Sequence, residues 1–283
     1  MFNNYGKKAA LAFGVLVGAL TATAHSQSEK VIKIATEGAY APWNFTEAGG
    51  KLAGFEIDLL ENLCPRMKVK CELIVQDWDG LIPALNAEKF DAIVSGMLMT
   101  KEREKVISFS RNYATGSAAF LVRKDSPLAE MAFGKKYDLE KEPEQARAAA
   151  DEMRKAMQNS VIGGQGATTA ALIMKDMFPD IEYKEYKSTE QHDLDLAAGR
   201  IDAIMASPVT LDQALAHIGA DQVMFAGAEF TGGPLGGGQS VGLRKEDTEL
   251  KALFDEAINA AIADGSLSKL AIKWFKRDIT PSQ

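Results

Sequence analysis

The sequence predicts an α/β protein of two similar lobes, each a mostly parallel sheet flanked by helices. Short β-rich runs alternate along the chain with runs of helical period, which is typical of βαβ units. The segment Leu85–Ser95 (LNAEKFDAIVS) also has a counterpart at Leu196–Ala206 (LAAGRIDAIMA). Each copy reads as a helix end, a turn and a strand, so the fold repeats unless the match is a coincidence. The 283 residues, 46% of them hydrophobic, are sufficient for two cores.

The elements of the first lobe follow one another from residue 31. Val31–Glu37 is a β-rich run, and Pro42 interrupts the chain after it because proline lacks an amide donor and restricts the preceding residue. Apolar residues at helical spacing, with acids in the first turn, predict a helix at Gly54–Leu63. The other expected elements are a strand at Val69–Val75, a helix at Leu81–Asn86, a strand at Asp91–Ser95 and a helical turn at Lys101–Lys105.

The second lobe repeats the alternation. Its expected elements are strands at Val161–Gly163, Ile181–Tyr186, Asp202–Ala206 and Val223–Phe225, and helices at Thr168–Phe178 and Glu190–Ala198. A glycine-rich stretch, Thr231–Gln239, then leads to a strand at Gln239–Arg244, an amphipathic helix at Glu249–Ala263 and the segment Leu267–Phe275. Because this tail brings no strand partner of its own, we expect it to return to the first lobe.

These elements place residues 25–116 and 239–283 in lobe 1 and residues 117–230 in lobe 2, with a crossing at 231–238. Two crossings, near Thr115–Ala119 and Gly232–Gly238, permit a hinge between lobes around a cleft. The segment 135–159 is rich in Lys, Glu, Gln and Ala. We expect it to be a surface insertion whose helix, Pro143–Gln158, faces solvent rather than a partner.

The first 24 residues predict export. Lys7 and Lys8 precede the apolar run Ala9–Leu20, and Ala22–Ala24 supplies the small residues that a signal peptidase requires. The run is short for a transmembrane span, so an uncleaved anchor is the weaker alternative. No cysteine lies at the cleavage region, so a lipid anchor is not indicated.

Cys64 and Cys71 are the only cysteines, and they lie seven residues apart. Export leads to an oxidising compartment, so we expect a disulfide between the predicted helix and the next strand; two buried free thiols are the alternative.

Composition excludes several function classes. A net charge of −7 argues against a general nucleic-acid binder, which needs a basic surface. Three histidines and two cysteines leave little material for a zinc site.

Candidate ligand-binding residues follow the predicted strands, because ligands of open α/β sheets collect at the carboxyl ends of strands. Arg103 is suited to hold a carboxylate through two parallel hydrogen bonds. Glu37 is suited to pair with an ammonium or guanidinium group, which Trp78 or Tyr40 would cover. The remaining candidates at strand ends are Ser95, Gly96, Met97, Leu98, Gly164, Gln165, Gly166, Ala167, Thr168, Thr169 and Ser207.

Each candidate also has a purely structural interpretation. Arg103 is compatible with a charge on a solvated helix, Trp78 with a core residue, and Thr168 with a helix cap. The glycines at 163–166 do not have the spacing of a dinucleotide-binding motif. The joint placement of these side chains at the strand ends of two lobes favours a binding cleft.

Residues from about Val31 to Phe275 resemble the periplasmic solute-binding proteins of ABC importers for polar amino acids and opines, such as the lysine-arginine-ornithine-, histidine-, octopine- and nopaline-binding proteins. The motifs that carry the resemblance are Glu37–Trp43 (EGAYAPW), Gly54–Leu59 (GFEIDL), Trp78–Pro83 (WDGLIP), Lys89–Ile93 (KFDAI), Arg103 with Phe109–Ser110, Gly199–Ala203 (GRIDA) and Val241–Lys245 (VGLRK). The resemblance implies the type II periplasmic-binding-protein fold, a monomer that closes on one small ligand in the interlobe cleft and delivers it to a membrane permease. It implies neither a cofactor nor a metal.

The resemblance also assigns roles to residues. Arg103 would take the α-carboxylate, Tyr40 and Trp78 would flank the ligand, and Glu37 would face its distal cationic group. Ser95–Leu98 and Gln165–Thr169 would supply further contacts.

The departures from the family pattern bear on the ligand. Binders of free basic amino acids have an Asp where Ser207 stands, and that Asp pairs with the α-ammonium. A neutral residue here, together with Glu37 and the insertion at 135–159, resembles the opine binders, whose ligands are N-substituted amino acids with extra carboxylates. Leu98 departs from both groups, in which this position is small or hydroxylic, so it would narrow the pocket. We therefore expect an opine or related conjugate, with arginine, ornithine or histidine as the alternative.

Two other function classes compete. The fold also carries a cyclohexadienyl-dehydratase-like enzyme activity, but catalysis requires a placed acid or base. Glu37 is the only carboxylate that the pattern places firmly in the cleft, and His192 and His217 fall on predicted helices, so we expect no turnover. A sensor without transport would require a fused or partner signalling domain.

Overall fold

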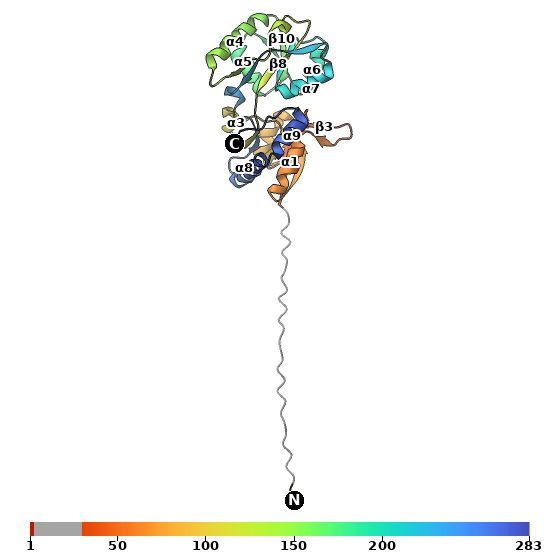
Figure 1. Cartoon of the computed structure of the whole chain (residues 1–283), viewed down its shortest axis with the longest axis vertical. Helices are drawn as coiled ribbons and strands as arrows, with labels where there is room; N and C mark the ends of the chain where they lie inside the picture. The colour runs from red at the N-terminus through yellow and green to blue at the C-terminus, as the bar shows by residue number, and fades with distance from the viewer. Residues whose placement is uncertain (3–29, 283) are drawn as a thin grey trace.

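The computed structural model describes residues 1–2 and 30–282. Two α/β bodies lie one above the other in Figure 1, the lower one containing α1, α8 and α9 and the upper one containing α4 to α7. The predicted signal peptide, residues 1–24, lies outside the described residues apart from its first two. No helix in the described part of the chain combines the length and apolar character needed to cross a bilayer.

The lower body is built on a five-stranded sheet in the order β5-β1-β6-β14-β7. Its strands are β1 (Lys30–Thr36), β5 (Val69–Val75), β6 (Ala92–Ile93), β7 (Ser108–Ala114) and β14 (Gln239–Leu243). β1 runs parallel to β5 and β6, whereas β14 is antiparallel to β6 and β7. The strand β14 therefore lies in the same sheet as β1, and the helices after it pack against this body.

Helices and a small second sheet complete this body. They are α1 (Phe55–Arg66), α2 (Leu81–Asn86), α3 (Lys101–Glu104), α8 (Thr248–Ala263), α9 (Ser266–Phe275), the 3₁₀ turn η1 (Trp78–Gly80), and the strands β2 (Ala39–Tyr40), β3 (Asn44–Thr46) and β4 (Leu52–Ala53). The apolar stripe of α1 is buried against the sheet, where Phe55 packs on Trp43 and Phe275. Each large apolar side chain buried in this way contributes roughly 1.5–3 kcal/mol.

The upper body contains a six-stranded sheet in the order β11-β10-β12-β8-β13-β9. Its strands are β8 (Ala118–Arg123), β9 (Lys136–Asp138), β10 (Val161–Gln165), β11 (Glu182–Tyr186), β12 (Ala203–Ala206) and β13 (Val223–Thr231). Its helices are α4 (Pro143–Ala156), α5 (Thr169–Met177), α6 (Thr189–Ala197), α7 (Pro208–Ile218) and the 3₁₀ turns η2 (Pro127–Glu130) and η3 (Gly233–Leu235). β10 is parallel to β11 and β12, while β8 is antiparallel to its neighbours β12 and β13.

The segment 135–159 is more than a solvent-facing insertion. β9 pairs with β13 at the edge of the sheet. Ala146, Ala150 and Met153 on one side of α4, and Met157 directly after it, are buried in the apolar cluster of the upper body. These positions recur at helical spacing among charged residues, which is why composition alone suggested a fully solvated helix.

The disulfide prediction is confirmed: Cys64, in the last turn of α1, is bonded to Cys71 in β5, with their Cα atoms 6.1 Å apart.

Candidate functional site

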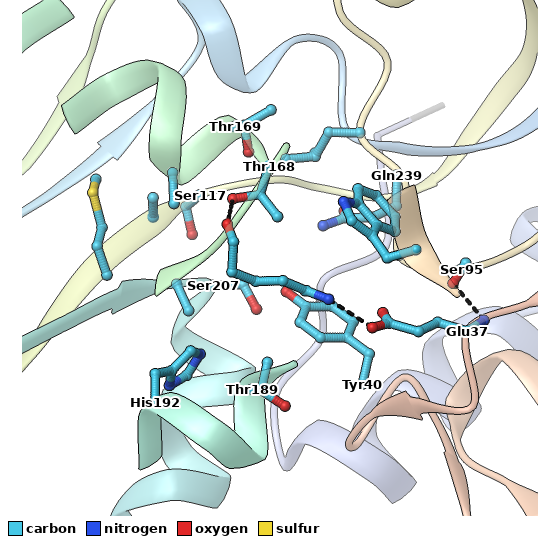
Figure 2. Close-up of a pocket in the computed structure, with 18 of the residues that line it drawn as sticks. Glu37, Tyr40, Ser95, Ser117, Thr168, Thr169, Thr189, His192, Ser207 and Gln239 are labelled. Atoms are coloured by element: carbon cyan, nitrogen blue, oxygen red, sulfur yellow. Dashed lines mark hydrogen bonds between the residues drawn. The ribbon is translucent and has the colours of Figure 1, made fainter. Parts of the chain in front are cut away.

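A cavity between the two bodies collects most of the predicted binding residues (Figure 2). From the candidates it is lined by Glu37, Tyr40, Trp78, Ser95, Gly96, Leu98, Arg103, Gln165, Thr168, Thr169 and Ser207. Glu37, Tyr40 and Ser95 come from the β1–β2 and β6 ends of the lower sheet, and Gln165, Thr168 and Ser207 come from the β10 and β12 ends of the upper sheet. Strand ends of both sheets therefore converge on one site.

The structure places the other four candidates outside this cavity. Met97 is 1% exposed and packs in the core of the lower body. Gly164 is buried, and a Cβ there would lie 2.3 Å from the Tyr183 hydroxyl, so this glycine permits close packing against Tyr183. Gly166 and Ala167 line a neighbouring cavity of about 430 Å³ that shares Glu37 and Trp78 with the first.

Sequence reasoning missed several lining residues: Ser117, Ala118, Ala170, Thr189, His192, Met205, Ala206 and Gln239. Ser117 lies in the first predicted crossing and Gln239 directly follows the second, so the crossings were the available signal for both residues. The sequence predicts a surface or core role for His192; the side chain is buried, at 1% exposure, and it also lines the cavity. Its Nδ1 lies 3.0 Å from Asp193 Oδ1, in a geometry that makes no hydrogen bond.

Glu37 brings a buried carboxyl to the cavity and is itself only 7% exposed (Figure 2). Ser95 Oγ accepts a hydrogen bond from the Glu37 amide at 2.9 Å, and Gln165 Nε2 donates to Glu37 Oε1 at 2.6 Å. Glu37 Oε2 has no hydrogen-bond partner within the described residues. Desolvation raises the pKa of Glu37 to about 7, against the effect of the Gln165 hydrogen bond. This carboxyl is thus prepared to gain from a cationic partner.

Arg103 brings the cation. Its Nη1 donates to the Leu98 carbonyl at 2.8 Å, its Nη2 donates to the Ala167 carbonyl at 3.1 Å, and its guanidinium lies 5.2 Å from the centre of the Trp78 ring. Burial lowers the pKa of Arg103 to about 10, so the group stays charged at neutral pH. Only carbonyl oxygens accept its side-chain hydrogen bonds in the described part of the chain, so a carboxylate would add an ionic partner.

Tyr40 and Ser207 form a neutral part of the wall. Ser207 caps the start of α7, and its hydroxyl lies 2.8 Å from Thr210 Oγ1. Desolvation raises the pKa of the Tyr40 hydroxyl, and hydrogen bonding to Ser207 and Thr210 opposes that rise. This part of the wall therefore presents hydroxyl groups to the cavity.

The neighbouring cavity is acidic. Besides Glu37 it is lined by Asp77 and Asp79 from the lower body and by Glu185 from the upper body, against a single basic residue, Lys187. Both aspartates act to raise the pKa of Glu37 further. Within residues 30–282, no group of three or more His, Cys, Asp or Glu side chains is arranged to hold a metal ion.

Comparison with known proteins gives the family. The model of the bacterial extracellular solute-binding proteins, family 3, matches residues 32–277. The octopine-binding periplasmic protein of Rhizobium meliloti is 42% identical over an alignment of 273 residues, covering 89% of this chain and 92% of that protein. The L-arginine-binding protein of Pseudomonas aeruginosa is 32% identical, covering 93% of this chain and 96% of that protein.

A solved structure agrees. A periplasmic His/Glu/Gln/Arg/opine family-binding protein from Silicibacter pomeroyi, in complex with lysine, is 30% identical, superposes with a TM-score of 0.70 and covers 89% of this chain and all of that one. The resemblance to the family and its fold is thereby confirmed, and the chain belongs to family 3 of the bacterial extracellular solute-binding proteins, in its polar amino acid and opine branch.

Proposed function

We propose that this protein captures an opine, or a related amino-acid derivative with a cationic end, in the cavity between its two bodies. The observation that carries the proposal is one cavity lined by both Arg103 and Glu37, an arginine without an acidic partner and a buried carboxyl with a free oxygen among the described residues. A ligand with a carboxylate at one end and a guanidinium or ammonium at the other satisfies both groups.

The acidic neighbouring cavity supports a cationic ligand end. Asp77, Asp79 and Glu185 approach from both bodies, so a cation between them reduces the repulsion that closure brings. Trp78 lines both cavities, so its ring lies between the Arg103 guanidinium, 5.2 Å from the ring centre, and the acidic side of the site.

Ser207 supports an opine over a free amino acid. In a closed site, a primary ammonium facing neutral hydroxyls loses water without gaining a counter-charge. A secondary amine with an added carboxylate needs less counter-charge from the protein there, because the carboxylate of the ligand itself lies beside the amine. The 42% identity to an octopine-binding protein points in the same direction.

The remaining parts of the proposal follow the family. We propose that residues 25–116 with 239–283 form one lobe and 117–230 the other, and that the protein acts in the periplasm as a monomer after cleavage of its signal peptide. The closed form would deliver its ligand to an ABC permease, and the protein would catalyse no reaction on the ligand.

The test is a calorimetric titration of the mature protein, freed of bound ligand by unfolding and refolding, with octopine, nopaline, L-arginine, L-ornithine and L-histidine. Tight binding of an opine with a much weaker response to arginine is the expected result. Preferential binding of arginine or ornithine would replace the opine assignment with a basic amino-acid binder. Release of product from prephenate or arogenate would overturn the assignment of a non-catalytic role.

A further inference from the structure

One buried carboxyl outside the cavity is connected to two of the segments that form it. Glu56 lies in the first turn of α1 and is 0% exposed. Its oxygens accept hydrogen bonds from Asn44 Nδ2 at 2.6 Å, from the Gly96 amide at 2.6 Å and from the Tyr113 hydroxyl. Asp58, the other acid of that turn, instead bonds Lys273 and Trp274 at the surface, so Glu56 is not there simply to complement the helix dipole.

The first connection leads to the segment that carries Glu37 and Tyr40. Asn44 is 0% exposed, and its Oδ1 accepts a hydrogen bond from the Gly38 amide at 2.7 Å. Gly38 directly follows Glu37 and has a positive φ of 69°. The Asn44 side chain therefore fixes a backbone turn between the two cavity residues, and Glu56 fixes Asn44 by accepting from its other end.

The second connection leads to the segment that carries Ser95. Gly96 also has a positive φ, 60°, and a Cβ there would lie 2.9 Å from the Tyr40 ring. The Gly96 amide donates to the same oxygen of Glu56 as the Tyr113 hydroxyl. Ser95 in turn accepts from the Glu37 amide, so the two segments are held to each other as well as to Glu56.

We propose that Glu56 is a positioning residue for ligand binding: its carboxylate, directly through Gly96 and indirectly through Asn44 and Gly38, holds both segments of the lower body that face the ligand. This inference rests on the proposed function only in taking Glu37 and Tyr40 as ligand contacts. Three donors converge on Glu56, and a carboxylate is the side chain that accepts from all of them without presenting a donor in return.

The direction of each hydrogen bond makes the proposal testable by exchanging the two partners. In Glu56→Gln, the new NH2 group meets another donor in either orientation of the side chain. It faces the Asn44 side-chain amide in one orientation, and the Gly96 amide and Tyr113 hydroxyl in the other. In Asn44→Asp, two buried carboxyl groups meet, so either one of them takes up a proton or their repulsion moves them apart. In the double variant, the new carboxylate at position 44 accepts from both the new side-chain amide at position 56 and the Gly38 backbone amide. The side-chain oxygen at position 56 keeps the bonds from Gly96 and Tyr113, so each of the four hydrogen bonds of the wild-type network has a counterpart again.

The experiment measures three quantities on the wild type, both single variants and the double variant. They are the dissociation constants for octopine and L-arginine, the exchange rates of the Gly38 and Gly96 amides by NMR without ligand, and the melting temperature. We expect each single variant to raise the dissociation constant about tenfold or more, since a buried unsatisfied donor or acceptor is costly. We expect exchange at Gly38 to accelerate in both, and the double variant to return to within about twofold of the wild type.

Tyr113→Phe is the matched control. It removes a hydrogen bond to the same Glu56 carboxyl, but this bond connects Glu56 to neither of the two ligand-facing segments. It should lower the melting temperature and leave both dissociation constants within about twofold. Single variants that melt earlier but bind and exchange like the wild type would overturn the proposal, as would a double variant no better than the singles.

Two further outcomes remain decisive. If a single variant does not fold, Asn44→Ala takes its place. This variant leaves Glu56 its bonds to Gly96 and Tyr113 but removes the link to Gly38. Full affinity for the ligand in Asn44→Ala would overturn the proposal. If the wild type binds neither octopine nor arginine, the proposed function fails, and the amide exchange rates alone decide whether Glu56 holds the two segments.

Discussion

Replacing Glu37 with glutamine should remove the pH dependence of ligand binding. The carboxyl is 7% exposed, and burial raises its pKa to about 7. In the ligand-free protein Glu37 is therefore about half protonated at neutral pH. A guanidinium or ammonium group gains a counter-charge only from the ionised form, so ligand binding and loss of this proton are linked.

The magnitude follows from the pKa of about 7. At pH 5 only about 1% of Glu37 is ionised in the free protein, so affinity for octopine or arginine should fall up to ~100-fold between pH 8 and pH 5. The free energy of unfolding without ligand should change in the opposite direction. The folded pKa is raised above the reference value of 4.5, so this stabilisation is complete below pH 4.5 and is lost as pH rises through about 7. It amounts to at most ~3 kcal/mol.

The assay is calorimetric titration of both proteins with octopine and L-arginine from pH 5 to pH 8, with thermal unfolding of the ligand-free proteins in the same buffers. Glutamine keeps an oxygen for the Gln165 hydrogen bond, and His192 is common to both proteins, so their difference isolates Glu37. A wild-type affinity that does not change with pH, or a variant that keeps the wild-type slope, would refute the reasoning.

Other predictions test the remaining parts of the site. Arg103→Ala should weaken binding of a carboxylate ligand by about 2–5 kcal/mol with an unchanged circular-dichroism spectrum, and undiminished affinity would contradict its assigned role. Ser207→Asp should shift the ratio of arginine to octopine affinity at least ~10-fold toward arginine, because it supplies a charge for a primary ammonium; calorimetry with both ligands checks this, and a constant ratio would count against the opine assignment. Replacing Cys64 and Cys71 together by serine should lower the free energy of unfolding in urea by roughly 2–3 kcal/mol, and a value equal to that of the wild type under oxidising conditions would contradict this.

The regular alternation of strands and helices made most of the fold predictable. Strands β7 and β8 were not predicted. In β7 the polar residues Ser110, Arg111 and Asn112 interrupt the apolar pattern, yet Ser110 is 3% exposed and its hydroxyl accepts from the Val241 amide within the sheet. A serine that satisfies a neighbouring strand cannot be distinguished in sequence from one that faces water.

The site was predictable where it follows a strand. Glu37, Ser95 and Gln165 lie at strand ends and face the cavity. His192 lies on a helix, and its position depends on how α6 packs against the end of β10, which no local pattern records. The same holds for Glu56, whose place in the first turn of α1 suggests a helix-dipole role until its partners are known.

Arg103 connects ligand recognition to the relative placement of the two bodies. One of its hydrogen bonds goes to Leu98 in the lower body and another to Ala167 in the upper body. Gln165 of the upper body likewise donates to Glu37 of the lower body, and Thr189 donates to the Ala39 carbonyl. The groups that would hold the two ends of a ligand are thus also the groups that join the bodies.

A ligand that neutralises both Arg103 and Glu37 offsets the desolvation cost of burying these two charges when the bodies close. It should therefore stabilise the closed arrangement in proportion to how well it satisfies both groups. A ligand that satisfies only one of them should bind without fully stabilising closure. Small-angle scattering with arginine and with an analogue that keeps the α-carboxylate but has an uncharged side chain would separate the two cases. Equal compaction by both ligands would contradict this coupling.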